Sequence, residues 1–225
     1  MATTRMATRR ESAEAVRRRL SPAERERQIV DGAIELFAEV GFGGQTRELS
    51  RRLGITQPLL YRYFPSKQDL VERVYREAFL GKWNPAWEAL LADRTRPLRD
   101  RLVDFYGQYT QVIFTPQWIR LYLHAGLLGI GYNRRYIGRL EERLLRPICV
   151  EVRATLGLRA TAQAVTPEEL ELVWMFHAGI FYYGVRKYVY RMATRLGAER
   201  MIAAAVDGML QGIPQTLQAR ARPRR

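Results

Sequence analysis

The sequence predicts an all-α fold in which a small N-terminal helical domain precedes a larger helical one. Three observations predict it: apolar residues recur at three- and four-residue spacing, two segments open with the same cap, proline and glutamate pattern, and no stretch alternates as a strand does. With 225 residues, 47% of them hydrophobic, the chain can bury one large core or two smaller ones. Disordered and disulfide-stapled classes of protein are therefore excluded.

The first regular helix is predicted to begin at Ser21, after a flexible basic arm that covers residues 1–20. Ser21 can cap the helix, Pro22 suits its first turn, and Glu24 completes a capping box. The apolar stripe of this helix ends at Gly41 and consists of Ile29, Ala33, Leu36, Phe37 and Val40.

The next segment has the pattern of two short helices joined by a tight turn. A helix over about residues 46–53 is followed by Gly54, which tolerates the positive φ that such a turn needs. Thr56 can then cap a second helix that has Pro58 near its start. This is the geometry of a helix-turn-helix, whose second helix offers its N-terminal residues to base edges in the major groove of DNA. Residues 21–75 are therefore predicted to form a helix-turn-helix DNA-binding domain.

Residues 55–70, Ile-Thr-Gln-Pro-Leu-Leu-Tyr-Arg-Tyr-Phe-Pro-Ser-Lys-Gln-Asp-Leu, resemble the signature of the TetR family of transcriptional regulators (TetR/AcrR type), and the strong match covers about residues 25–75. The resemblance implies a sequence-specific DNA-binding regulator, namely a repressor that binds a palindromic operator as a homodimer and is released by a small-molecule effector. The alternative is an architectural or cell-division factor of the same fold that binds DNA without any small ligand.

Position by position, the resemblance also implies which residues meet DNA. Gln57 is the expected base reader, and Leu59 is placed to meet a thymine methyl group. Gly43-Gly44-Gln45 departs from the Ser or Thr caps common in the family and leaves the start of the helix at Thr46 open. The alternative interpretation is a helical hairpin that touches no DNA. The expected DNA-binding set is Thr46, Arg47, Thr56, Gln57, Pro58, Leu59, Tyr61, Arg62, Tyr63 and Lys67.

Residues 76–219 are predicted to form the larger effector-binding and dimerisation domain, followed by a basic tail at 220–225. Thr166-Pro167 is expected to start a long helix to about residue 192, and Pro147 should kink or split a helix over about 134–156. Aromatic residues crowd this domain. Either they form its core, or some of them line a ligand pocket, for which the candidates are Tyr106, Tyr109, Trp118, Tyr122, Trp174 and His177.

The last helix, over about residues 198–212, carries small residues at four-residue intervals. Such a face lets a second helix approach closely, which is a reason for glycines that weaken the helix itself. In the TetR family the two final helices of each subunit form a four-helix dimer interface, whereas packing within one chain is the alternative. The expected interface residues are Ala204, Gly208, Gly212, Val206 and Met209.

Charge and composition bound the remaining functions. The net charge of +14 suits a polyanionic partner such as nucleic acid, although most of the excess lies outside the first 80 residues. One cysteine and two histidines cannot build a structural zinc site, and no acids, bases or nucleophiles cluster in sequence. The chain is therefore expected to be no enzyme, to use no cofactor or metal, and, lacking an apolar run of about 20 residues, to be cytoplasmic and free of the membrane.

Overall fold

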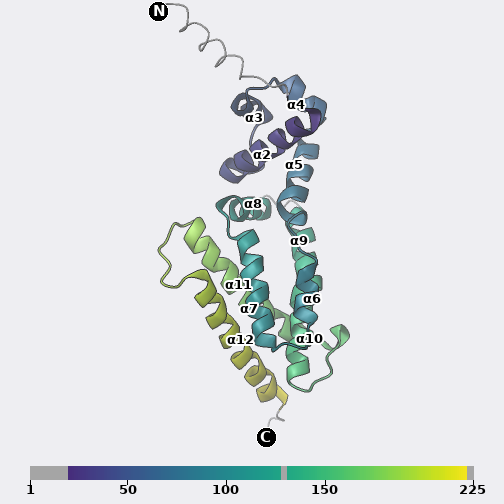
Figure 1. Ribbon diagram of the computed structural model, residues 1–225, viewed down its shortest axis with the longest axis vertical. Helices are drawn as coiled ribbons and strands as arrows, with labels where there is room; N and C mark the ends of the chain where they lie inside the picture. The colour runs from purple at the N-terminus through teal and green to yellow at the C-terminus, as the bar shows by residue number, and fades with distance from the viewer. Residues whose placement is uncertain (1–19, 128–130, 222–225) are drawn as a thin grey trace, which may run out of the picture.

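The computed structural model describes residues 20–127 and 131–221. The expected arm, apart from Leu20, and the last four residues of the expected tail lie outside this part of the chain. Within it the regular structure is helical (Figure 1). The α-helices are α2 (Pro22–Val40), α3 (Thr46–Leu53), α4 (Gln57–Tyr63), α5 (Lys67–Tyr75), α6 (Ala86–Ala92), α7 (Leu98–Ile113), α8 (Pro116–Leu127), α9 (Tyr132–Leu140), α10 (Arg146–Thr155), α11 (Pro167–Tyr188) and α12 (Ala198–Ala221).

Helix α2 begins as the sequence predicts. The Ser21 hydroxyl accepts from the Glu24 backbone N–H at 3.2 Å, and the Glu24 carboxylate accepts from the Ser21 N–H at 2.8 Å. The apolar stripe is buried except for Val40, the last residue of the helix, which is 55% exposed. The remaining stripe packs against α3, α5 and α8.

The two domains are joined by one unbroken helical segment. Helix α5 continues into a π-helical turn, η1 (Arg76–Leu80), in which the Gly81 N–H donates to the Arg76 carbonyl oxygen at 2.7 Å. The expected boundary after residue 75 therefore falls inside a helix rather than in a loop. Helix α8 lies directly beneath α2 in Figure 1, and a single hydrophobic cluster runs through both domains.

The larger domain is built around α7, with α11 and α12 side by side along one flank (Figure 1). Helix α11 starts with the capping box predicted at Thr166, but it ends at Tyr188, four residues before the predicted end. Helix α12 runs to Ala221 and passes through Pro214, so the predicted end at residue 212 was too early. A proline inside a helix gives no stop signal when the packing of neighbouring residues holds the helix together.

The predicted disturbance at Pro147 is present. Helix α9 passes through a second π-helical turn, η2 (Glu141–Leu145), into α10, where Pro147 occupies the first turn. Proline cannot donate to the carbonyl one turn earlier, and a wider turn accommodates the missing bond. A short 3-10 turn, η3 (Ala162–Ala164), then precedes α11.

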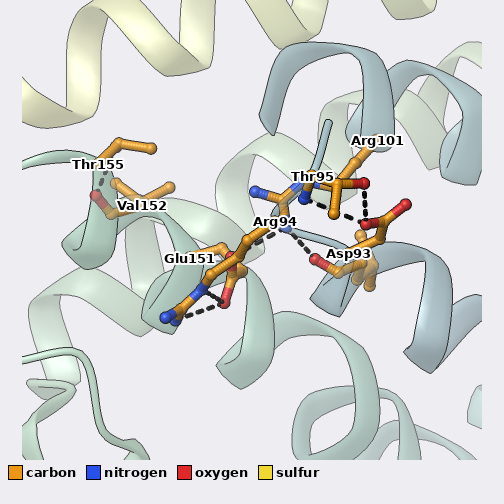
Figure 2. A network of polar contacts seen from close by, with 8 residues as sticks. Asp93, Arg94, Thr95, Arg101, Glu151, Val152 and Thr155 are labelled. Atoms are coloured by element: carbon orange, nitrogen blue, oxygen red, sulfur yellow. Dashed lines mark hydrogen bonds and ion pairs between the residues drawn. The ribbon is translucent and has the colours of Figure 1, made fainter. Parts of the chain in front are cut away.

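A buried ion-pair network anchors the loop after α6 to α10 (Figure 2). Arg101 is 3% exposed, and its guanidinium donates to Glu151 at 2.9 Å and to the carbonyl oxygen of Leu91. Arg94 donates to the same carboxylate from the solvent side at 2.9 Å. Burial raises the pKa of Glu151, but the hydrogen bonds from Arg94 and Arg101 outweigh it, so this pKa lies below its ordinary value.

No helix within residues 20–127 and 131–221 is both long enough and apolar enough to cross a bilayer.

Candidate nucleic-acid interface

Helices α3 and α4 meet at a tight turn set by Gly54. This residue has φ 63° and ψ 32°, in the left-handed backbone region that residues with a side chain rarely adopt. Its N–H donates back to the Arg51 carbonyl oxygen, and the next N–H, that of Ile55, donates to the Ser50 carbonyl oxygen at 3.0 Å. The chain leaves the turn extended at Thr56, whose hydroxyl accepts from the Leu59 N–H at 3.3 Å and caps α4.

Helix α4 has an inner and an outer side. Leu60 is fully buried and Phe64, at its end, is 5% exposed, so both pack into the small domain as predicted. Pro58, Tyr61 and Arg62 are exposed. Gln57, Leu59 and Tyr63 are half-buried. Residues 20–127 and 131–221 thus leave the outer side of this short helix exposed, as groove binding requires.

Thr46 has a different place from the other expected contacts. It is buried, and its hydroxyl lies 2.9 Å from the Tyr61 hydroxyl, which ties the first turn of α3 to the middle of α4. Gln45 precedes it as the helix cap but makes no side-chain capping bond. The unusual Gly-Gly-Gln segment therefore leaves α3 without a side-chain cap, and Thr46 orients the two helices instead.

The cations on this surface fall into two groups. Arg51 and Arg52 both donate to the Glu48 carboxylate at 2.8–2.9 Å, and Arg52 also reaches Glu39 at 2.7 Å. Hydrogen bonds from Arg51 and then Arg52 lower the pKa of Glu48 to about 2. The second group makes no ion pair or side-chain hydrogen bond within the part of the chain that the structure describes, and it consists of Arg47, Arg62 and Lys67. These three charges are available to phosphates.

The comparison with protein families agrees with this geometry. Residues 29–74, from α2 to the end of α5, match the family described as bacterial regulatory proteins, tetR family. Residues 29–74 of this chain form a tetR-family domain. The matched segment contains both helices of the helix-turn-helix and the two helices that support it.

Two curated relatives extend the likeness of this domain. The class A tetracycline repressor protein of Escherichia coli, from transposon 1721, is 31% identical over 86 residues, which is 34% of this chain and 39% of that repressor. The HTH-type transcriptional regulator LuxR of Vibrio harveyi is 36% identical over 59 residues, or 26% of this chain and 29% of LuxR. The matches thus span well under half of either relative.

Solved structures of TetR-family regulators share the whole fold. A TetR-like regulator from Rhodococcus sp. RHA1 superposes with a TM-score of 0.64 at 17% identity, covering 86% of this chain and 100% of that one. A TetR-family regulator from Mesorhizobium loti gives a TM-score of 0.58 at 14% identity, covering 88% and 98%. At these identities, the likeness between the larger domain of this chain and those regulators is one of fold alone.

The six residues expected to line a ligand pocket lie among packed aromatic side chains. The Tyr106 hydroxyl lies 3.3 Å from Nδ1 of the buried His177, and the Tyr109 hydroxyl lies 2.8 Å from that of Tyr136, a partner the sequence did not single out. The Trp174 indole N–H donates to Glu141 at 3.2 Å. The remaining two, Trp118 and Tyr122, stack with ring centroids 5.2 Å apart. Among the six, Trp118 borders a cleft, which lies between α2 and α8.

The expected dimer residues divide between two environments. Ala204, Gly208 and Gly212 are exposed, and beside the two glycines there is open space. Val206 and Met209 are buried in the core of their own chain, because they lie on the side of α12 that faces α7. The exposed small residues adjoin an exposed face of α11 that the sequence had not marked, which carries Met175, Ala178, Gly179 and Tyr182.

Proposed function

We propose that the chain is a transcriptional repressor that binds a palindromic operator as a homodimer and is released from it by a small molecule. The observation that carries this proposal is the exposed outer side of α4 together with the cations Arg47, Arg62 and Lys67, which have no ion pair among the described residues. Phosphate contacts by such cations hold the protein on DNA, and Gln57 and Leu59 at the start of α4 then read base edges.

The homodimer is supported by the exposed face of α11 and α12. Met175 is 70% and Tyr182 52% exposed in a single chain, and the glycines of α12 leave room for a partner helix beside them. A symmetric pair built on this face would present its two α4 helices about 34–36 Å apart, one turn of DNA, which is the spacing a palindrome requires.

The oligomeric state tests the interface. Sedimentation of the purified chain should give a dimer, and Gly208→Arg should give a monomer because the guanidinium fills the space a partner helix needs. Gly138→Arg on α9 is the matched control, since Gly138 is also exposed with open space beside it. A monomeric parent protein, or a Gly208→Arg variant that stays dimeric, would remove this interface.

Selection of duplexes from a random pool tests DNA recognition. The parent protein should enrich an inverted repeat, and Gln57→Ala should relax the preference at one position in each half-site, a loss of about 1–3 kcal/mol of discrimination there. An unchanged consensus from the Gln57→Ala variant would take base reading away from this residue. Enrichment of no sequence at all would overturn the proposed function.

The alternative is an architectural or cell-division factor that uses the same fold and binds DNA constitutively. Both proteins would pass the duplex selection. They differ in release, because the architectural factor would keep its affinity for DNA in the presence of every small molecule that binds it, whereas the repressor would lose affinity.

A further inference from the structure

A cleft of about 630 Å³ lies where α2, η1, α7 and α8 meet. At this place α8 passes beneath α2 and beside the end of α5 (Figure 1). This volume falls within the range of about 300–1,000 Å³ typical of small-molecule sites. The walls come from α2, η1, α7 and α8, so a molecule in the cleft touches both domains at once.

The polar rim of the cleft is acidic. Asp31 and Glu35 of α2 and Glu77 of η1 line the cleft together with Lys82, giving three carboxylates to one ammonium group in a chain whose net charge is +14. Asp31 and Glu35 are exposed and make no ion pair within the part of the chain that the structure describes, whereas Glu77 lies 3.8 Å from Arg73. Two of the three negative charges are therefore uncompensated.

The floor of the cleft is apolar. It is formed by Ile34, Ala78, Val112, Trp118 and Leu121. Trp118 is 6% exposed and is held by stacking on Tyr122, so its position is fixed before anything binds. An apolar floor beneath an anionic rim suits a molecule with an apolar body and a positive charge, and an indole at the floor adds favourable contact with a cation.

We propose that this interdomain cleft binds an amphipathic organic cation, and that the bound cation alters the affinity of the chain for DNA. The second half rests on the proposed function. Glu77 and Ala78 belong to the π-helical turn that joins the domains, and π-turns occur frequently at functional sites. A cation held between this turn and α2 stabilises one placement of the DNA-binding helices over another, which is the differential affinity that allosteric release requires.

Calorimetric titration of the full chain with tetraphenylphosphonium, in the absence of DNA, tests the site. Tetraphenylborate has the same shape and the opposite charge, and it should not bind. Asp31→Asn combined with Glu35→Gln should weaken tetraphenylphosphonium binding about five- to thirtyfold, whereas Lys82→Gln should strengthen it about two- to fivefold. The strengthening cannot come from misfolding.

Glu142→Gln combined with Glu171→Gln is the matched control, because it removes two exposed carboxylates outside the cleft and should leave binding unchanged. Equal affinity for the two probe ions, or an Asp31→Asn/Glu35→Gln variant that binds tetraphenylphosphonium as the parent does, would overturn the cation site.

DNA binding with and without saturating tetraphenylphosphonium tests the coupling. The parent protein should lose affinity for its selected operator at least about fivefold, the low end of typical allosteric coupling, and Asp31→Asn/Glu35→Gln should be unaffected. Operator affinity that does not respond to the bound cation would overturn the coupling and leave the site standing. A chain that binds the cation but selects no DNA would overturn the proposed function and leave the cation site standing.

Discussion

Two arginines on α3 form ion pairs within the protein itself. Arg51 and Arg52 share the carboxylate of Glu48, so their contribution to a phosphate contact is reduced by the neighbouring negative charge. Lys67, at the first position of α5, has no such competitor within the described residues. We therefore expect Lys67 to contribute more to the affinity for DNA than Arg51 or Arg52, although each carries one positive charge.

We predict that Lys67→Ala weakens binding to all DNA sequences alike and lowers the slope of log affinity against log salt by about one, the signature of one lost phosphate contact. Arg51→Ala, which also removes one positive charge, should change the slope by less because Glu48 is then freed as well. Equal slopes for Lys67→Ala and the parent protein, measured by fluorescence anisotropy over a salt series, would contradict the phosphate contact.

Ser50 is the clearest local flaw in the small domain. It is 4% exposed on the inner face of α3, and its hydroxyl oxygen has no hydrogen-bond partner in the described structure. We predict that Ser50→Ala raises the free energy of unfolding by about 1 kcal/mol, because it removes a buried unsatisfied group and introduces a better helix former. Urea denaturation would measure the gain, and a lower midpoint for the variant would mean that the hydroxyl has a partner in solution.

The sequence predicted correctly those contacts that join residues close together along the chain. The caps at Ser21, Thr56 and Thr166 bond to backbone three residues away, so local pattern suffices to predict them. The bond between Thr46 and Tyr61 spans 15 residues and depends on the angle between two helices. Both residues stay predicted DNA contacts, but local pattern gives no means to see that their hydroxyls meet.

At the scale of helices, the close approach of one helix to another explains the position of one glycine. A Cβ added to Gly184 of α11 would lie 2.7 Å from the ring of Phe114, at the end of α7. The glycine therefore lets α11 lie against the junction of α7 and α8. This is a packing role, and it differs from that of Gly208 and Gly212, beside which a single chain leaves open space.

The ion pairs around α10 give the most sensitive test of helix docking. We predict that Glu151→Gln lowers the free energy of unfolding by about 3 kcal/mol, because the buried Arg101 charge loses its counter-charge. Arg94→Gln is the control and should cost under about 1 kcal/mol, since Arg94 is 59% exposed and only its partner is buried. Chemical denaturation of both variants would settle the difference, and equal losses would show that burial of Arg101 is not the cause.

Helix starts were easier to predict than helix ends. Helices α2 and α11 start with a cap, a proline and a glutamate in fixed order, whereas α11 stops at Tyr188 without a glycine or proline to mark the place. There the chain turns through Tyr190 and Arg191, which has φ 53°, and the Tyr183 hydroxyl donates to the Leu196 carbonyl oxygen at 2.7 Å. Contacts between distant residues decide that end.

At the scale of the whole molecule, the buried His177 at the centre of the larger domain should make the free energy of unfolding depend on pH. Burial lowers the pKa of His177 from 6.5 to about 4. The unfolded chain takes up a proton on this residue below about pH 6.5, but the folded chain does so only below about pH 4, so the free energy of unfolding should fall as pH falls through this window. The full difference is about 3 kcal/mol at about 1.4 kcal/mol per pKa unit.

Comparison with His177→Gln isolates this effect, because glutamine does not titrate. The parent protein should lose about 3 kcal/mol more than the variant between pH 6.5 and pH 4 in urea denaturation, while changes common to both report carboxylates such as Glu151. Parallel pH profiles for the two proteins would show that His177 is accessible to protons in the folded state.

The all-α fold and the helix-turn-helix were predictable because both follow from local patterns of apolar spacing and turn residues. The interdomain cleft was not. Its acidic rim combines Asp31 and Glu35 with Glu77, more than 40 positions later, and its floor adds residues of α7 and α8 to Ile34 and Ala78. The aromatic residues that suggested a pocket pack against one another, and composition alone cannot distinguish a filled core from a hollow one.

The π-helical turn between the domains also sets the orientation of one domain relative to the other. A π-turn holds one residue more than an α-helical turn, so η1 rotates the chain beyond Leu80 by about 100° relative to an uninterrupted α-helix. We expect deletion of one residue there to rotate α2 to α5 relative to the larger domain and to disturb the contact of α2 with α8. The orientation of α4 relative to the larger domain thus depends on the winding of a single turn.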